Sequence, residues 1–196
     1  MKKSTIVLFV LLVAFPICGI AQVSDITKIN DKLTERPWLD LHAYELYGYT
    51  ITQVFGERRA IQSHSNLGSI TTMAYLDQQQ LLAGINTMDI PKEKKAELKE
   101  KYKNEAAGGA VQLFITRLTE SRANFRWFFI VIRGEDDKEK IMEIDLEYQA
   151  SQLPDANGWW NYTTVLLPKP MNFPFYVYVN DRQSQYLSDY KFKVSK

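Results

Sequence analysis

Glu143, Asp145 and Glu147 occupy alternate positions of one segment. Alternate residues of a β-strand project from the same face, so these acids are expected to form one row. Such a row could bind a hard cation such as Ca²⁺, or flank a glycosidic bond as an acid and base pair. Because wet strand faces carry acids routinely, we interpret the row as a solvated face and keep a polysaccharide hydrolase as an alternative function.

A second candidate site is aromatic. Turn-forming residues run directly into two adjacent tryptophans, which face opposite ways on an extended chain. We therefore expect one tryptophan to enter the core and the other to be exposed beside the loop. An exposed ring with amides nearby can stack on a sugar or anchor a protein interface. The predicted ligand-binding residues are Trp159, Trp160, Tyr162, Asn157 and Asn161.

Signatures of catalysis, metal binding and cofactor binding are absent from the sequence. There is no G-x-S-x-G, no phosphate-binding G-x-x-x-x-G-K-[ST] and no H-E-x-x-H motif. The chain has two histidines, His42 and His64, whereas a zinc site needs three or four ligands. Two serines flank His64, but adjacency in sequence is not the geometry of a catalytic triad. We therefore expect no catalytic residue, no metal and no cofactor.

The first 21 residues have the pattern of a signal peptide. Lys2 and Lys3 precede an uncharged apolar run, residues 6–15, which Pro16 ends. Residues 19–21 supply small side chains at the positions that signal peptidase recognises, so cleavage is expected before Gln22. The apolar run is too short for a membrane span, which needs about 20 residues. The predicted domains are thus a signal peptide, 1–21, and a single β-rich domain, 22–196.

The single cysteine, Cys18, lies inside the expected leader. A lipoprotein cleavage motif would need a small residue before it, and Ile17 is bulky. Cleavage before Gln22 would leave a mature chain without cysteine, and so without a disulfide or a thiol nucleophile. We expect a periplasmic or secreted protein with no membrane span in the mature chain.

Charge is balanced along the chain, with 24 basic and 23 acidic residues. This balance gives no basis for a nucleic-acid partner. Aromatic residues make up 13% of the chain, which argues against disorder and is typical of β-rich cores.

A strand buried on both faces is predicted for residues 126–133, RWFFIVIR. Its odd and its even positions, which face opposite sides of a strand, are both largely apolar. Residues 141–149 alternate cleanly, so Met142, Ile144, Leu146 and Tyr148 are expected to point inward. The loop 134–138 should join the two as adjacent antiparallel strands. Further strands are expected at 46–55, 58–62, 69–76, 110–118, 163–167, 173–180 and 190–194.

Helical signals are confined to two regions. Residues 24–34 have Ile26, Ile29 and Leu33 at helical spacing. The segment 77–109 contains a charged helix that begins near Asp89 and Pro91 and ends at Gly108–Gly109. Its thin apolar stripe and mixed charges indicate a solvated surface helix over one flank of the sheet.

The expected fold is an antiparallel β-sandwich or closed barrel of about nine strands with one inserted surface helix. The alternative is an α+β fold with that helix packed on a sheet face. The expected function is that of an exported non-enzymatic binding domain that recognises an envelope protein or glycan. Besides the hydrolase, a purely structural envelope component is the remaining alternative.

Overall fold

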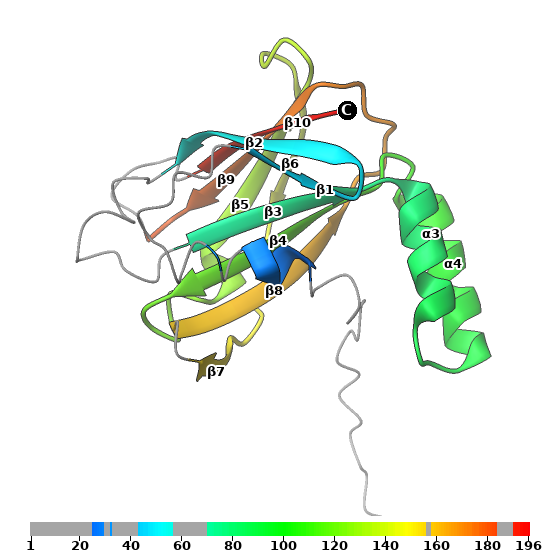
Figure 1. Cartoon of the computed structure of the whole chain (residues 1–196), viewed down its shortest axis with the longest axis horizontal. Helices are drawn as coiled ribbons and strands as arrows, with labels where there is room; N and C mark the ends of the chain where they lie inside the picture. The colour runs from blue at the N-terminus through cyan, green and yellow to red at the C-terminus, as the bar shows by residue number, and fades with distance from the viewer. Residues whose placement is uncertain (1–24, 30–31, 33–42, 57–69, 156–157, 184–189) are drawn as a thin grey trace, which may run out of the picture.

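The computed structural model describes residues 25–29, 32, 43–56, 70–155, 158–183 and 190–196. In this part of the chain, ten strands form two antiparallel sheets (Figure 1). The strands are β1 Ala43–Leu46, β2 Tyr49–Gly56, β3 Ile70–Leu76, β4 Ala110–Arg117, β5 Phe128–Arg133, β6 Lys140–Asp145, β7 Gln152–Asp155, β8 Gly158–Leu166, β9 Phe175–Asp181 and β10 Tyr190–Ser195.

Sheet A has the strand order β1-β2-β10-β9-β5-β6, and sheet B has the order β3-β4-β8-β7. Neighbouring strands pair antiparallel throughout. Among the described strands the two sheets do not join, so the predicted mainly β, sandwich-like fold is confirmed and no closed barrel is formed there. As expected, β5 and β6 are adjacent, with Ile130 opposite Ile144.

The core lies between the two sheets and consists of side chains from alternate positions along the strands. In β5, Phe128, Ile130 and Ile132 are fully buried. They meet inward-facing residues of sheet B, such as Leu113 and Ile115. Because strand residues alternate between faces, each strand contributes every second side chain to this layer.

The prediction that β5 is buried on both faces is wrong. Trp127 precedes the strand, and Phe129 and Val131 lie on its outer side; all three are only partly buried. The strand lies between β9 and β6 within sheet A, but no helix or second sheet of the described chain covers this outer face. The apolar residues of segment 126–133 are therefore of two kinds: some lie in the core and others are partly exposed on the outer face.

Strand β6 is an edge strand and is shorter than expected, since it ends at Asp145. Glu143, Asp145 and Glu147 are exposed, as predicted. Leu146 is buried and Met142 packs on the core, but Ile144 is 38% exposed and Tyr148 is 67% exposed. The inward assignment of Tyr148 is wrong because this residue follows the end of the strand.

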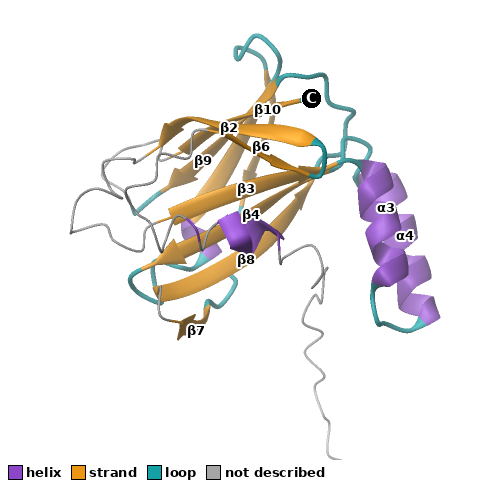
Figure 2. Ribbon diagram, viewed as in Figure 1, coloured by secondary structure: helices purple, strands orange, loops and turns teal. Residues whose placement is uncertain are grey.

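The expected single helix is a pair, α3 Gln78–Thr87 and α4 Lys92–Glu105. Asp77 caps α3, and its carboxylate accepts from the backbone N–H of Gln80 at 2.8 Å. Asp89 does not cap α4, whose preceding residue is Pro91. Both helices extend away from one end of the sheets (Figure 2). The pair therefore does not lie over a flank of the sheet, and the α+β alternative is not observed.

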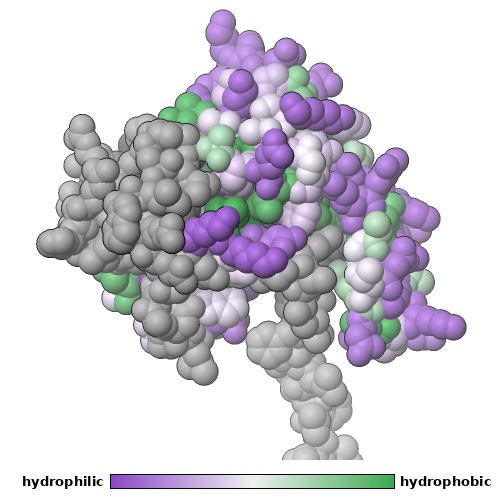
Figure 3. Space-filling model, in the orientation of Figure 1, coloured by the Kyte–Doolittle hydropathy of each residue, from purple (hydrophilic) through white to green (hydrophobic). Residues whose placement is uncertain are grey.

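The apolar stripe of α4 is used inside this pair. Tyr102 and Ala106 are buried in a cluster with Leu81 and Ile85 of α3. The charged side chains of α4 lie on its remaining surface, and Figure 3 shows hydrophilic residues interspersed with apolar ones over the helix pair. The helix is solvated as predicted, but its apolar contact is mainly with α3.

The segment predicted as one strand over 46–55 is a hairpin of β1 and β2. Tyr47 and Gly48 form its turn, with φ of 55° and 76°. Two successive positive φ angles fit a two-residue hairpin turn, although asparagine is far commoner than tyrosine at the first position.

Residues 25–29 are helical, and Ile26 and Ile29 are buried as their spacing predicted. Leu33, the expected strand 58–62 and the expected signal peptide lie outside the described residues. Among the helices of the described residues, none combines the length and apolar character needed to cross a membrane.

Candidate functional site

The five predicted ligand residues do not form one surface. Trp160 and Tyr162 lie on the outer face of sheet B, whereas Trp159 and Asn161 alternate to the other face of β8. Both tryptophans are partly buried, so the expected division into one buried and one exposed ring is not observed. Asn157 lies outside the described residues.

Asn161 is an internal residue with no exposed surface. Its amide nitrogen donates to the carbonyls of Ala123 and Gln149, both at 2.9 Å. Its amide oxygen accepts from the N–H of Tyr162 at 2.9 Å. These bonds connect two loops to sheet B, and they leave the side chain no access to an external ligand.

The aromatic residues on the outer face of sheet B are covered by other side chains. Trp160 stacks on Phe114, with ring centroids 5.5 Å apart and planes 13° from parallel. Ile26, from the helix at residues 25–29, packs into the same cluster, and Tyr162 lies beside it. Phe114 is only 5% exposed, so this stack works mainly as packing.

The acid row lies on an open edge. The Glu143 carboxylate accepts from the Lys140 ammonium at 2.8 Å, and Asp145 pairs with Arg182. Among the described residues, no group of three acids, histidines or cysteines is placed to hold a metal ion. His42 and His64 lie outside the described residues.

A different cluster forms on the outer face of sheet A. Register places Arg133 opposite Tyr176 and Val131 opposite Tyr178. On the other side of β9, Lys193 is opposite Tyr176 and Lys191 is opposite Tyr178. We call this cluster the basic face and define it by Phe129, Arg133, Tyr176, Tyr178, Arg182, Lys191 and Lys193.

Cations lie over the rings of the basic face. The Arg133 guanidinium is 5.4 Å from the centroid of Tyr178. The Lys191 ammonium lies 4.7 Å from the centroid of Tyr176 and 5.2 Å from that of Tyr178. Arg182 is 5.1 Å from the centroid of Phe129. Within about 6 Å, such contacts attract the cation to the negative face of the ring and hold it in place.

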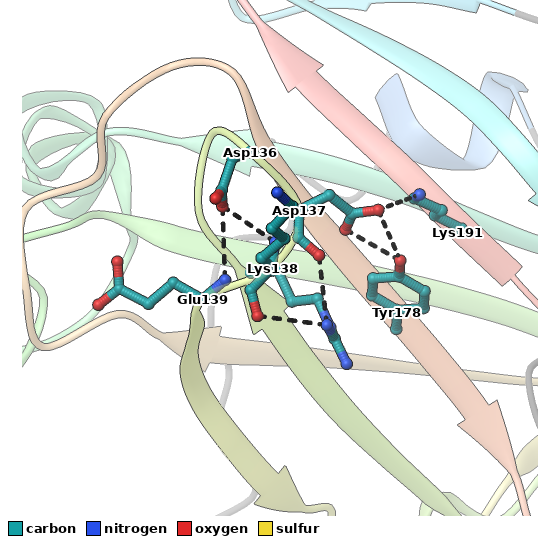
Figure 4. A network of polar contacts seen from close by, with 7 residues as sticks. Asp136, Asp137, Lys138, Glu139, Tyr178 and Lys191 are labelled. Atoms are coloured by element: carbon teal, nitrogen blue, oxygen red, sulfur yellow. Dashed lines mark hydrogen bonds and ion pairs between the residues drawn. The ribbon is translucent and has the colours of Figure 1, made fainter.

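Asp137 joins the β5–β6 hairpin to this face (Figure 4). The Tyr178 hydroxyl donates to its carboxylate at 2.9 Å, and the Lys191 ammonium donates to the same group. Partial burial alone would lower the pKa of Lys191, but its hydrogen bonds with Asp137 and Tyr178 outweigh that effect and raise it. Lys191 is therefore charged and neutralised locally.

Two cations of the face lack such a counter-charge. Arg133 donates through one terminal nitrogen to the carbonyls of Asp137 and Lys138, at 3.2 and 3.4 Å. Its Nε is buried and has no hydrogen-bond partner in the described structure. Neither Arg133 nor Lys193 forms an ion pair with a carboxylate of the described residues. Both are partly exposed, so the face has positive charge available for a ligand.

No single segment of the sequence contains this cluster, because its residues come from three strands, β5, β9 and β10. Arg133, Tyr176 and Lys193 meet only through the pairing of β5 with β9 and of β9 with β10. The available signal was local: tyrosines at 176 and 178 and lysines at 191 and 193 share a face by alternation.

Comparison with known proteins adds no relative. The chain matches no protein-family model, no curated protein and no solved structure.

Proposed function

We propose that this chain is an exported, non-enzymatic binding domain that recognises an envelope protein or glycan, and that it binds through the basic face of sheet A. The observation that carries the proposal is the set of cations stacked on partly exposed rings over β5, β9 and β10. The tryptophan pair is a weaker candidate, because Trp160 lies in a cluster with Ile26.

Stacking prepares the cations for binding. A free lysine or arginine loses up to about 2 kcal/mol of side-chain entropy when it is fixed by a ligand. The Tyr178 ring and two hairpin carbonyls already restrict Arg133, the stacked cation that lacks a counter-charge, so less entropy remains to be lost when a ligand binds it. A rigid strand scaffold also places functional groups more reproducibly than a loop does.

The hydrolase alternative receives less support from the geometry. An acid–base pair for glycoside cleavage needs carboxylates that flank the scissile bond. Glu143 and Asp145 are instead exposed on the edge strand β6, and each pairs with a cation. A purely structural component would have no ligand. The following experiment therefore distinguishes it from a binding domain.

The test blocks the face without assuming what binds there. In a chain with C18S, the substitution K193C places the only thiol on the basic face, and K94C places it on the exposed surface of α4. Each thiol is coupled to a maleimide-linked poly(ethylene glycol). The uncoupled K193C and K94C proteins are first tested against neutral polysaccharides, acidic polysaccharides and purified envelope proteins, so that the effect of coupling is separated from the loss of the lysine.

Binding that is lost on coupling at 193 and retained on coupling at 94 supports the proposal. Equal binding by both coupled proteins would place the site elsewhere. Absence of binding to every member of the panel would favour a structural component.

A further inference from the structure

We infer that the ligand of the basic face is an acidic polysaccharide, whose anionic groups are bound by Arg133 and Lys193 on either side of Tyr176. This inference rests on the proposed function and specifies its ligand class.

The charge of the face selects an anion. Lys191 is neutralised by Asp137, and Arg182 by Asp145. Arg133 and Lys193 are the cations of the basic face that no described carboxylate neutralises. A ligand with negative groups supplies that counter-charge, whereas a neutral sugar chain leaves it unpaired.

The spacing of these cations favours an extended polymer. Arg133, Tyr176 and Lys193 lie in one row across β5, β9 and β10. Neighbouring strands are about 4.8 Å apart, so the two cationic residues are separated by about 10 Å along the row. One small anion would reach either residue, but a chain with repeated anionic groups reaches both. The row therefore fits a polymer that crosses the strands.

The strand arrangement favours a sugar chain over an acidic peptide. Peptides that bind to sheets commonly add a strand to an open edge and use its backbone groups. Strands β5, β9 and β10 each have a partner on both sides, so their backbone groups are occupied. Only side chains are available on this face, and side-chain donors suffice to bind carboxylate or sulfate groups.

Arg133 is oriented for such contacts. One terminal nitrogen is held by two carbonyls of the hairpin, and its guanidinium lies over the Tyr178 ring. Its Nε is buried without a hydrogen-bond partner in the described residues, so a ligand at the surface does not reach that atom. The hydrogen bonds to the hairpin use only one terminal nitrogen, so the other terminal nitrogen, Nη2, is the donor that remains for an anionic oxygen.

Acidic residues at the tip of the β5–β6 hairpin mark one end of the surface on which an anionic ligand could lie. The Asp136 carboxylate accepts from the N–H groups of Lys138 and Glu139, so it is turned into its own loop. In Figure 4, Asp136 and Glu139 lie on the other side of the hairpin from Tyr178 and Lys191. A polyanion is therefore expected to run across the strands and avoid the tip.

The test compares polymers that differ in charge and in backbone. Polygalacturonate is the acidic glycan, dextran the neutral glycan and poly-glutamate the acidic peptide. Binding to each is measured by isothermal titration calorimetry for the full chain. The double variant R133Q/K193Q removes the two unpaired cations, and K94Q/K103Q removes two exposed cations of α4 as a control with the same net charge.

We expect the wild-type chain to bind polygalacturonate, and R133Q/K193Q to bind it at least about tenfold more weakly, since tenfold corresponds to about 1.4 kcal/mol. K94Q/K103Q should bind like wild type, and dextran should not bind. Raising the salt concentration from about 0.05 M to about 0.5 M should weaken binding, because ions screen exposed charges. Melting curves of both variants verify that they are folded.

Two results would overturn the inference while the binding function stands. One is binding of dextran as tightly as polygalacturonate, with blockage by coupling at 193. The other is tighter binding of poly-glutamate than of polygalacturonate, which would make the partner an acidic protein. If coupling at 193 blocks no ligand in the panel, the proposed function fails together with this inference.

Discussion

On the outer face of sheet B, Phe114 and Trp160 stack under Ile26 and form part of the packed interior. On the outer face of sheet A, Phe129, Tyr176 and Tyr178 lie at equivalent alternating positions but are covered by cations and remain partly exposed. The residue types are similar on the two faces. What lies above the rings decides whether they act as core or as a platform for charged groups.

The difference also explains why aromatic content is a poor guide to a binding site. An aromatic ring contributes most of its hydrophobic energy when another apolar group excludes water from it. Phe114 obtains that from Ile26 and Trp160. Tyr178 instead donates to Asp137 and carries Arg133, which leaves charged groups at the surface.

The largest expected effect is on Phe114. Phe114→Ala should reduce the free energy of unfolding by about 3–5 kcal/mol, the usual cost of removing a buried aromatic. Phe129→Ala on the basic face should cost about 1 kcal/mol, because the ring is already partly exposed. Urea denaturation of both variants measures the difference. Equal losses would mean that the two faces are equally packed.

The covering helix should show the next largest effect. A short helix is not stable alone, so the helical residues 25–29 depend on the contacts of Ile26 and Ile29. Ile26→Ala should cost about 2–4 kcal/mol. Lys28→Ala is the control, since its side chain is 70% exposed and its pair with Asp25 is worth less than about 1 kcal/mol. A similar small loss in both variants would show that the helix does not cover the sheet.

Alkaline pH should weaken the packing of the helix at residues 25–29 on sheet B. Burial, assisted by the negative charge of Asp25, raises the pKa of Tyr47 to about 12. A tyrosine whose pKa is raised on folding contributes stability below its unfolded pKa of about 10, and this contribution is lost as the pH rises towards 12. Other buried tyrosines shift in the same direction, so the comparison is between wild type and Tyr47→Phe.

The stability advantage of wild type over Tyr47→Phe should shrink between about pH 10 and about pH 12. Denaturation midpoints of the two proteins across this range give the measurement. A constant difference would show that Tyr47 ionises without affecting the cover.

The smallest effect is expected at the acid row. Glu143→Gln removes an exposed pair with Lys140 and should change stability by less than about 0.5 kcal/mol. It should leave binding through the basic face unchanged. A polysaccharide-cleaving activity that disappears in this variant would instead revive the hydrolase alternative.

Much of the architecture was predictable because strand alternation is a local property. The antiparallel pairing of 128–133 with 140–145 follows from the short loop between them, and the outward position of Glu143 and Asp145 follows from a period of two. The division of the helical region into two helices was missed, although Asp77 and Gln80 form a capping box that the sequence contains.

The five predicted ligand residues do not form one site, because their adjacency in the chain does not make them neighbours on one surface. Alternation sends Trp160 and Tyr162 to one face of β8, and Trp159 and Asn161 to the other. The basic face, by contrast, has members as far apart in the chain as Phe129 and Lys193. No local pattern brings them together, because the order of strands in a sheet is decided by the whole fold.

The sequence by itself determined which side chains share a face of each strand. Only the tertiary structure decided which faces are covered. RWFFIVIR reads as buried on both sides, yet the outer side of β5 is partly open. AVQLFITR contains Gln112 and Thr116, yet every residue of β4 is buried. Alternation is set by the backbone of one strand, whereas burial depends on what packs above it, and that layer comes from distant parts of the chain.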